Sequence, residues 1–418
     1  MKPKPGFVQN VYLVLTLFNT LATSFIWGIN TLFLLDAGLN NAEAFLANAF
    51  FTIGQVIFEV PTGIVADIRG RRTSYILGTL TLAGSTLLYL GAWMAHAPFW
   101  VWAISSILLG LGYTFFSGAT EAWLVDAMAY SEYRGQMESV FAKGQATSGI
   151  AMLAGSVAGG FIAQFSDLGV PYILRAAFLL VNFGIAVFFM RDWGFTPEKS
   201  VNLGADVRKL FGTSVDLGLR KPAIRWVMLG APFASGVGFY VFYAMQPHLL
   251  SLYGDPTAYS IGGLMAAIFA LTQIAGGLAA PMIRRLFQLR TSALLWGEIL
   301  GVTGLLLLGI AANFWLAIGI VSVWGLLFSC IMPIRQSYLN TLIPSKQRAT
   351  VLSFDSLMGS AGGVVIQPIL GRSADLWGYM QSFILGGVIN SLAVPLAVLA
   401  RRENIRMEAQ GELEAKPA

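Results

Sequence analysis

Long apolar segments dominate the sequence, and each is about as long as an α-helix that crosses a lipid bilayer. Such a helix needs about 20 mainly apolar residues. A series of twelve segments therefore predicts an all-α integral membrane protein. They lie at residues 10–35, 43–66, 73–95, 98–128, 135–165, 170–191, 223–250, 258–283, 289–311, 314–342, 348–372 and 378–401.

The composition supports a membrane protein and argues against several other classes. Of the 418 residues, 56% are hydrophobic and only 11% are charged, whereas a soluble domain carries about 25% charged residues. The single cysteine, Cys330, cannot form an internal disulfide. The net charge of +5 comes from residues in short gaps between apolar segments. This distribution favours membrane topology over nucleic-acid binding.

A weak internal repeat divides the chain into two halves. A shift of 214 residues places Gly63 on Gly277 and Arg134 on Arg348. Transporters often contain such repeats, with one site between halves that rock about it. We therefore expect six-helix bundles at 1–192 and 223–402, a cytoplasmic linker at 193–222, and a polar cytoplasmic tail at 403–418.

The positions of lysine and arginine predict the orientation of the chain. With twelve spans, nearly all of these residues fall in the tails, the linker and alternate loops, which share one side of the membrane. The positive-inside rule places that side in the cytoplasm. Both termini are therefore expected in the cytoplasm, and the protein in the inner (plasma) membrane of a bacterium.

The strongest motif ends the second apolar segment. It reads Pro-Thr-Gly-Ile-Val-Ala-Asp-Ile-Arg-Gly-Arg-Arg over residues 61–72. It resembles the loop motif of the major facilitator superfamily, in which glycine, aspartate and a Gly-Arg-Lys/Arg sequence follow the second span. The resemblance, together with the span count and the repeat, implies two pseudo-symmetric six-helix bundles and transport by alternating access.

The same resemblance implies a latch at the cytoplasmic face. In the family, the aspartate and arginine of the motif often pair with an acid near the end of the fourth span. The latch is thought to close the cytoplasmic side when the cavity opens outward. The alternative is that the arginines only satisfy topology and bind lipid headgroups. The matching residues here are Asp67, Gly70, Arg71, Arg72 and Asp126.

The fifth segment resembles a motif of proton-coupled drug exporters. Residues 155–160 read Gly-Ser-Val-Ala-Gly-Gly, with Ser156 where the exporter motif has proline. The fourth segment also departs from the family, since Ile107 to Gly112 has no nearby arginine. Small residues at these positions also allow close helix packing.

Ionisable residues inside the apolar segments are candidates for a proton or substrate site. Charges at membrane depth are costly and usually face a cavity or a partner. Under the repeat, Glu121 aligns with Arg335, so the two halves offer an acid and a base to one cavity. Structural ion pairs are the alternative. Glu298 receives less weight, because its helix is peripheral in the family. The candidates are Glu59, Glu121, Lys143, Arg335 and Asp355.

Aromatic and amide side chains of the first and seventh segments are candidates for the cavity lining. Both helices line the cavity in the family, and aromatic walls suit an amphiphilic organic substrate. Packing against helices or lipid is the alternative for each of these residues. The candidates are Asn19, Trp27, Asn30, Phe239, Tyr240, Tyr243 and Gln246.

These features together predict a secondary transporter that uses alternating access. Our first interpretation is proton-coupled export of an amphiphilic organic small molecule, by a monomer. A proton-coupled importer of a small organic solute is the alternative, followed by a membrane scaffold or sensor that does not transport. The sequence lacks a nucleotide-binding loop of the Gly-x-x-x-x-Gly-Lys-Ser/Thr type. We expect no enzymatic activity, cofactor, metal site or nucleic-acid partner.

Overall fold

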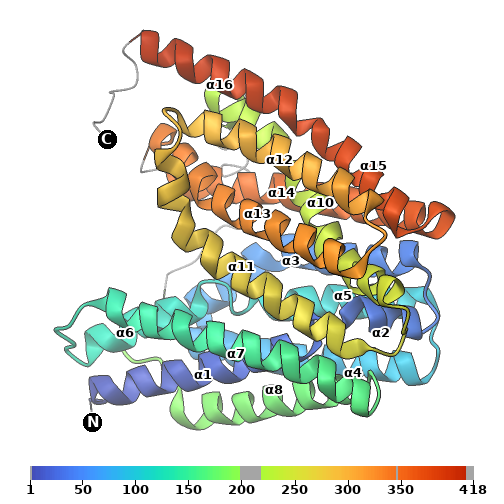
Figure 1. Ribbon diagram of the computed structural model, residues 1–418. Coiled ribbons are helices and arrows are strands. Elements are labelled where there is room, and N and C mark those ends of the chain that lie inside the picture. The colour runs from blue at the N-terminus through green and yellow to red at the C-terminus, as the bar shows by residue number, and fades with distance from the viewer. Residues whose placement is uncertain (1, 198–217, 345–346, 411–418) are drawn as a thin grey trace. The chain divides into compact units, whose positions relative to one another are not determined.

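The computed structural model describes residues 2–197, 218–344 and 347–410, and this part of the chain folds into helices and their connections (Figure 1). The all-α prediction is therefore confirmed. The helices of the first half are α1 (Pro5–Trp27), α2 (Asn30–Asp36), α3 (Asn41–Arg69), α4 (Arg71–Met94), α5 (Phe99–Thr114), α6 (Ala119–Tyr130), α7 (Met137–Phe165) and α8 (Val170–Phe189). Those of the second half are α10 (Pro222–Tyr253), α11 (Tyr259–Arg285), α12 (Arg290–Ile310), α13 (Phe314–Leu342), α14 (Arg348–Trp377), α15 (Tyr379–Ser391) and α16 (Ala393–Ala409).

Within the described residues, eleven helical segments are long and apolar enough to cross a membrane. Two of them combine consecutive helices, α5 with α6 and α15 with α16. The expected segment at 348–372 forms α14, which has 30 residues and is not among the eleven. It carries Asp355, Arg372 and Asp375, which lower its hydropathy. All twelve expected segments are thus helical.

The chain divides into two compact units. Of the described residues, 2–197 and 254–270 form the N-terminal unit, and the remainder form the C-terminal unit. The division falls within α11. Most of the predicted linker, residues 198–217, lies outside the described part, as do residues 411–418 of the predicted tail.

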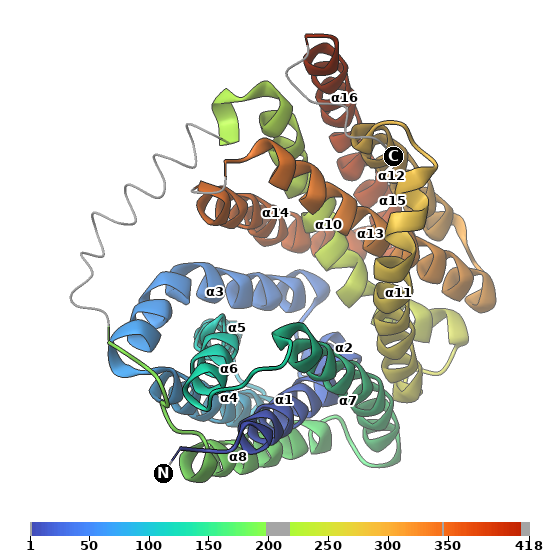
Figure 2. The same ribbon diagram turned by 90° about the vertical axis from the view of Figure 1, so that its left-hand side faces the viewer.

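The same helix pairs recur in both units (Figure 2). In the N-terminal unit, α1 packs against α7 and α8, and α4 packs against α5 and α8. In the C-terminal unit, α10 packs against α14, α15 and α16, and α12 packs against α13, α15 and α16. The neighbours of α1 therefore match those of α10, and the neighbours of α4 match those of α12, as a sequence repeat predicts.

Close helix contact in each unit depends on glycine. A Cβ on Gly159 of α7 would overlap the carbonyl oxygen of Phe25 on α1. A Cβ on Gly362 of α14 would likewise overlap the backbone of Pro232 on α10. Small residues let helix backbones approach closely in membrane proteins. The small residues at 155–160 therefore serve helix packing in this structure.

Candidate functional site

A cavity of about 570 Å³ lies within the C-terminal unit, lined by residues of α10, α11, α13 and α14. Small-molecule sites typically occupy ~300–1,000 Å³. We call this space the polar cavity, because hydrogen-bonding side chains are prominent in its lining. They include Ser235, Gln273, Ser329, Gln336, Ser356 and Ser360.

An ion pair between Arg335 and Asp355 forms part of this lining. The two guanidinium nitrogens donate to both carboxylate oxygens, with Nη1 at 2.5 Å from Oδ2 and Nη2 at 2.6 Å from Oδ1. Nη2 also donates to the backbone carbonyl of Val227, at 3.2 Å. The side chains are 18% and 11% exposed. The pair is thus bidentate and largely desolvated. Charge-assisted hydrogen bonds in this bidentate arrangement are stronger than hydrogen bonds between neutral groups.

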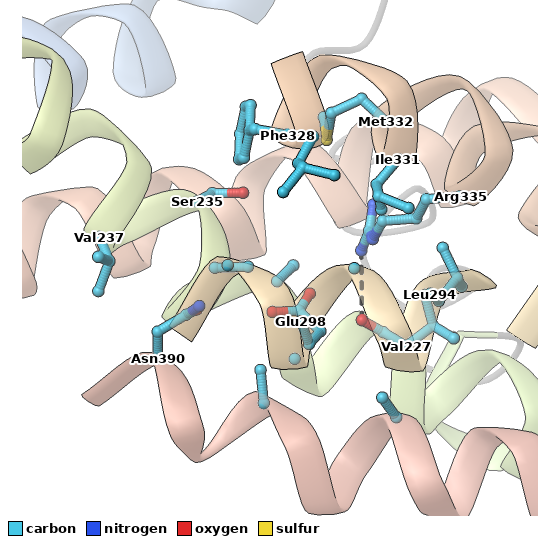
Figure 3. A pocket seen from close by; sticks show the side chains of 18 of the residues that line it. Val227, Ser235, Val237, Leu294, Glu298, Phe328, Ile331, Met332, Arg335 and Asn390 are labelled. Atoms are coloured by element: carbon cyan, nitrogen blue, oxygen red, sulfur yellow. Dashed lines mark hydrogen bonds between the residues drawn. The ribbon is translucent and has the colours of Figure 1, made fainter. Parts of the chain in front are cut away.

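Arg335 also lines a smaller cavity of about 70 Å³, and we call it the inner cavity. Glu298 of α12 and Asn390 of α15 both line it. Figure 3 shows Glu298 between Asn390 and Arg335. The family resemblance gave Glu298 little weight as a peripheral residue. In the structure, however, the Glu298 side chain points into the inner cavity, whose lining also includes Arg335.

The charged candidates of the N-terminal unit are more exposed. Glu59 accepts a hydrogen bond from Ser117 Oγ at 2.6 Å, and Lys143 Nζ lies 3.4 Å from Gln9 Oε1. Glu121 is exposed on α6. The structure therefore brings Arg335 and Asp355 together but holds the other three candidates in the other unit. A cavity shared by Glu121 and Arg335 stays a prediction.

The candidates for the cavity lining take several positions. Phe239 is 41% exposed and lines the polar cavity. Tyr240 is fully buried, and its hydroxyl lies 2.6 Å from Ser382 Oγ. Gln246 is also fully buried, and Tyr243 is partly buried beside Phe242. Of these four residues of α10, only Phe239 lines the polar cavity.

The three candidates of the first segment lie in the N-terminal unit. Asn30 donates to Asn48 Oδ1 at 3.0 Å and accepts a hydrogen bond from the Tyr172 hydroxyl at 3.1 Å. This network ties α2 to α3 and α8. Asn19 Oδ1 is buried without a hydrogen-bond partner in the described residues. Trp27 ends α1 and is partly buried.

The loop motif forms a compact charge cluster between α3 and α4. Arg71 Nη1 donates to Asp67 Oδ1 at 2.5 Å. Gly70 has φ +102°, a left-handed conformation that favours glycine. A Cβ at this position would also overlap Oδ2 of Asp192. Glycine is therefore favoured at position 70 for two reasons: its backbone conformation, and the lack of space for a Cβ beside the carboxylate of Asp192. Sequence reasoning missed Asp192.

The carboxylate of Asp192 contacts the turn between α3 and α4. Its Oδ1 accepts a hydrogen bond from the backbone N–H of Arg72 at 2.8 Å, while Arg72 Nη2 donates to the Val187 carbonyl at 2.7 Å. Burial raises the pKa of Asp192, and Arg72 partly opposes that shift. Asp126 forms no ion pair within the described residues. The acid that contacts the motif here is thus Asp192, and a role for Asp126 stays a prediction.

Sequence reasoning also missed Arg175 of α8. Its side chain is 2% exposed, and Nε donates to Thr86 Oγ1 at 3.0 Å. The guanidinium carbon lies 5.9 Å from the centroid of the Tyr113 ring. No carboxylate pairs with it among the residues that the structure describes. An arginine within an apolar segment was the signal that could have identified it.

The family model of the Major Facilitator Superfamily matches this chain over residues 12–289 and again over 228–418. The chain belongs to the major facilitator superfamily. The first match extends from α1 into the second half, and the second match lies within the second half. Together they cover spanning helices of both halves, so the predicted major facilitator fold is confirmed. The protein is accordingly an integral membrane transporter of small molecules and not an enzyme.

Two curated relatives in the superfamily are resistance proteins. The class G tetracycline resistance protein of Vibrio anguillarum is 27% identical over 365 residues, covering 83% of this chain and 85% of the relative. The class B protein of Escherichia coli is 25% identical over 342 residues, covering 68% and 83%. These likenesses confirm the resemblance to drug-exporting members.

Solved major facilitator structures share the fold at low identity. The nucleoside transporter NupG has a TM-score of 0.76 at 9% identity, covering 94% of this chain and 98% of that one. A D-xylose–proton symporter has a TM-score of 0.67 at 16% identity, covering 95% and 97%. At these identities the likeness bears on the fold alone.

Proposed function

We propose that this protein exports an amphiphilic organic small molecule in exchange for protons. The observation that carries this proposal is the buried Arg335–Asp355 pair in the wall of the polar cavity. An ionisable pair at membrane depth is a natural site for coupling substrate to proton movement. The lining also combines Phe239 and Phe328 with hydrogen-bonding groups, as an amphiphilic ligand requires.

The relatives support export over import. Both resistance proteins are named for tetracycline, a drug that combines fused rings with many polar groups. Each aligns with most of this chain, so the likeness extends to both units. We therefore choose tetracycline as the first transport probe and extend the assay to other amphiphilic compounds.

The cytoplasmic latch forms part of the same proposal. Asp67, Arg71 and Arg72, with Asp192 as the contacting acid, fix the turn between α3 and α4. The basic loops on this side favour the cytoplasm for both termini. Breaking these contacts in one conformation and restoring them in the other would bias alternating access.

Proton-coupled import is the second candidate function. Six hydrogen-bonding side chains in the polar cavity also suit a hydroxyl-rich solute. Such a site would reject a purely apolar compound, because its buried polar groups would lose partners. A scaffold without transport activity is the third candidate, and it needs none of these residues.

Transport in proteoliposomes tests the direction. Purified protein is reconstituted, a proton gradient is imposed, and uptake of tetracycline and a panel of amphiphilic dyes is followed. Export predicts that the probe accumulates on the side from which protons leave, and that an ionophore abolishes accumulation. Asp355→Asn should lose this flux. Glu132→Gln changes an exposed acid bound to Lys2 and serves as the control.

The other outcomes identify the alternatives. Accumulation of a solute on the side toward which the protons move would establish import. Equal activity of wild-type protein and Asp355→Asn would remove the ion pair from the mechanism. No gradient-dependent flux of any probe, in protein that remains folded, would support the scaffold.

A further inference from the structure

The two cavities of the C-terminal unit share Arg335. It lines the polar cavity beside Asp355 and the inner cavity beside Glu298. Among the described residues that line each cavity, these are the only ionisable groups. One cation therefore lines both cavities, and each cavity has one carboxylate in its lining.

The inner cavity is too small for an organic ligand. Its volume of about 70 Å³ accommodates a few water molecules, whereas drug-sized ligands need ~300 Å³ or more. Most of its lining is apolar, with Trp226, Leu294 and Trp324 among the larger side chains. The space therefore suits a protonated acid with water and not a substrate.

Asn390 offers a partner for such an acid. Its side chain is 5% exposed, and its Oδ1 has no hydrogen-bond partner among the described residues. Figure 3 shows its amide nitrogen turned toward Glu298, with which Asn390 makes a side-chain hydrogen bond. A carboxylic acid donates an O–H, while a carboxylate can only accept. The amide N–H that faces Glu298 can donate to a carboxylic acid as well as to a carboxylate, so a protonated Glu298 keeps this contact.

The contacts of Arg335 favour the same protonation state. Both of its terminal nitrogens are bound to Asp355, and Glu298 forms no ion pair within the described part of the chain. The charges of Arg335 and Asp355 cancel. A carboxylate on Glu298 would then be an uncompensated charge in an apolar space, which is strongly unfavourable.

We propose that Arg335 exchanges between Asp355 and Glu298, and thereby couples a cationic amphiphile in the polar cavity to a proton in the inner cavity. A cation that binds Asp355 releases Arg335. The guanidinium then turns to Glu298, whose O–H bond breaks and gives its proton to water in the inner cavity. One positive charge enters and one leaves, so the exchange is electroneutral.

This role in transport rests on the proposed proton-coupled export, but the exchange itself can be measured without a substrate. Infrared spectra of the reconstituted protein, recorded across a pH titration, detect the carbonyl stretch of a buried carboxylic acid. Glu298→Gln should remove one such band. Glu121→Gln, at an exposed intramembrane acid, should leave that band in place.

Two further variants test the coupling through Arg335. In Asp355→Asn, the arginine loses its partner and turns to Glu298. Glu298 should then ionise more readily, so the carboxylic-acid band should disappear at a lower pH than in wild-type protein. In the double variant Arg335→Gln with Asp355→Asn, the band should persist to higher pH than in wild-type protein. The double variant removes both charges together, which buried pairs tolerate better than loss of one partner.

The results separate the two proposals. A band that survives Glu298→Gln, or a titration that neither Asp355 variant shifts, would overturn the exchange even if proton-coupled export is observed. If the Asp355→Asn protein does not fold, the double variant alone decides the outcome. If the band shifts as predicted but no proton-coupled flux is observed, the exchange would be established and the proposed function overturned.

Discussion

The two units share a helix arrangement but differ in how they hold charge. Glu121 and Arg335 occupy corresponding positions in the sequence repeat. Glu121 is exposed on α6, whereas Arg335 is bound by both oxygens of Asp355 and by a backbone carbonyl. Of these two corresponding residues, only Arg335 is held in an ion pair within the described part of the chain.

At the loop between the second and third spans, it is the first half that holds the paired charges. In the N-terminal unit, Asp67 and Asp192 hold Arg71 and Arg72 at the turn between α3 and α4. The matching stretch of the C-terminal unit has Pro281 in place of the acid, and Arg284 donates to the carbonyl of Phe287. The charged cluster at the loop motif thus lies in the first half, and the buried Arg335–Asp355 pair lies in the second.

Removing the charge at the two corresponding positions should give the largest difference between the halves. Arg335→Gln leaves Asp355 buried without its partner, and we expect a loss of about 3–5 kcal/mol in unfolding free energy. Glu121→Gln changes an exposed group, and should stay within about 0.5 kcal/mol of wild type. Unfolding in detergent, followed by circular dichroism, measures both.

The double variant Arg335→Gln with Asp355→Asn controls for the pair. It should recover much of the stability that Arg335→Gln loses, because no charge remains uncompensated. Equal losses for Arg335→Gln and Glu121→Gln would mean that the asymmetry of the structure has no energetic consequence.

Helix contact should respond alike in both halves, which sharpens the comparison. Gly159→Ala and Gly362→Ala each place a methyl group against the backbone of a neighbouring helix. Overpacking of this kind costs about 1–3 kcal/mol. Gly184→Ala and Gly319→Ala meet open space and serve as the matched controls. Thermal unfolding should separate the pairs, and a loss in only one unit would argue against equivalent packing.

The helices could be predicted because hydropathy is a local property of the sequence. Each spanning segment is recognisable from about 20 consecutive residues, and even α14 was expected despite Asp355 and three further charges. The loop motif likewise identified Asp67 and Arg71, since an i,i+4 pair needs no long-range information.

The missing parts of the site depend on contacts between distant segments. Asp192 lies 120 residues from Arg72, and no local pattern connects them. Glu298 received little weight as a site residue because its helix is peripheral in the family. Its importance as a candidate follows instead from its position beside Arg335 in the inner cavity. Tyr240 and Phe239 are adjacent in sequence, yet only Phe239 lines the polar cavity. Helix orientation decides which one does.

The smallest predicted effect concerns Asp192 and separates the loop cluster from the ion pair by pH. Burial raises the pKa of this carboxyl above its value in the unfolded chain. The folded state therefore takes up a proton more readily, and stability gained from protonation is complete below the unfolded pKa. It is lost as pH rises through the folded pKa.

Asp192→Asn removes this titration while keeping an oxygen that can accept the hydrogen bond from the Arg72 backbone. The stability of wild-type protein relative to Asp192→Asn should thus increase as pH falls from neutral through the acidic range. Unfolding of the two proteins at matched pH values measures the difference, in which the titrations of other groups cancel. A difference that decreases with falling pH would show that the contacts with Arg72 outweigh burial. Asp192 would then stabilise the turn as a carboxylate, as Asp355 does for Arg335.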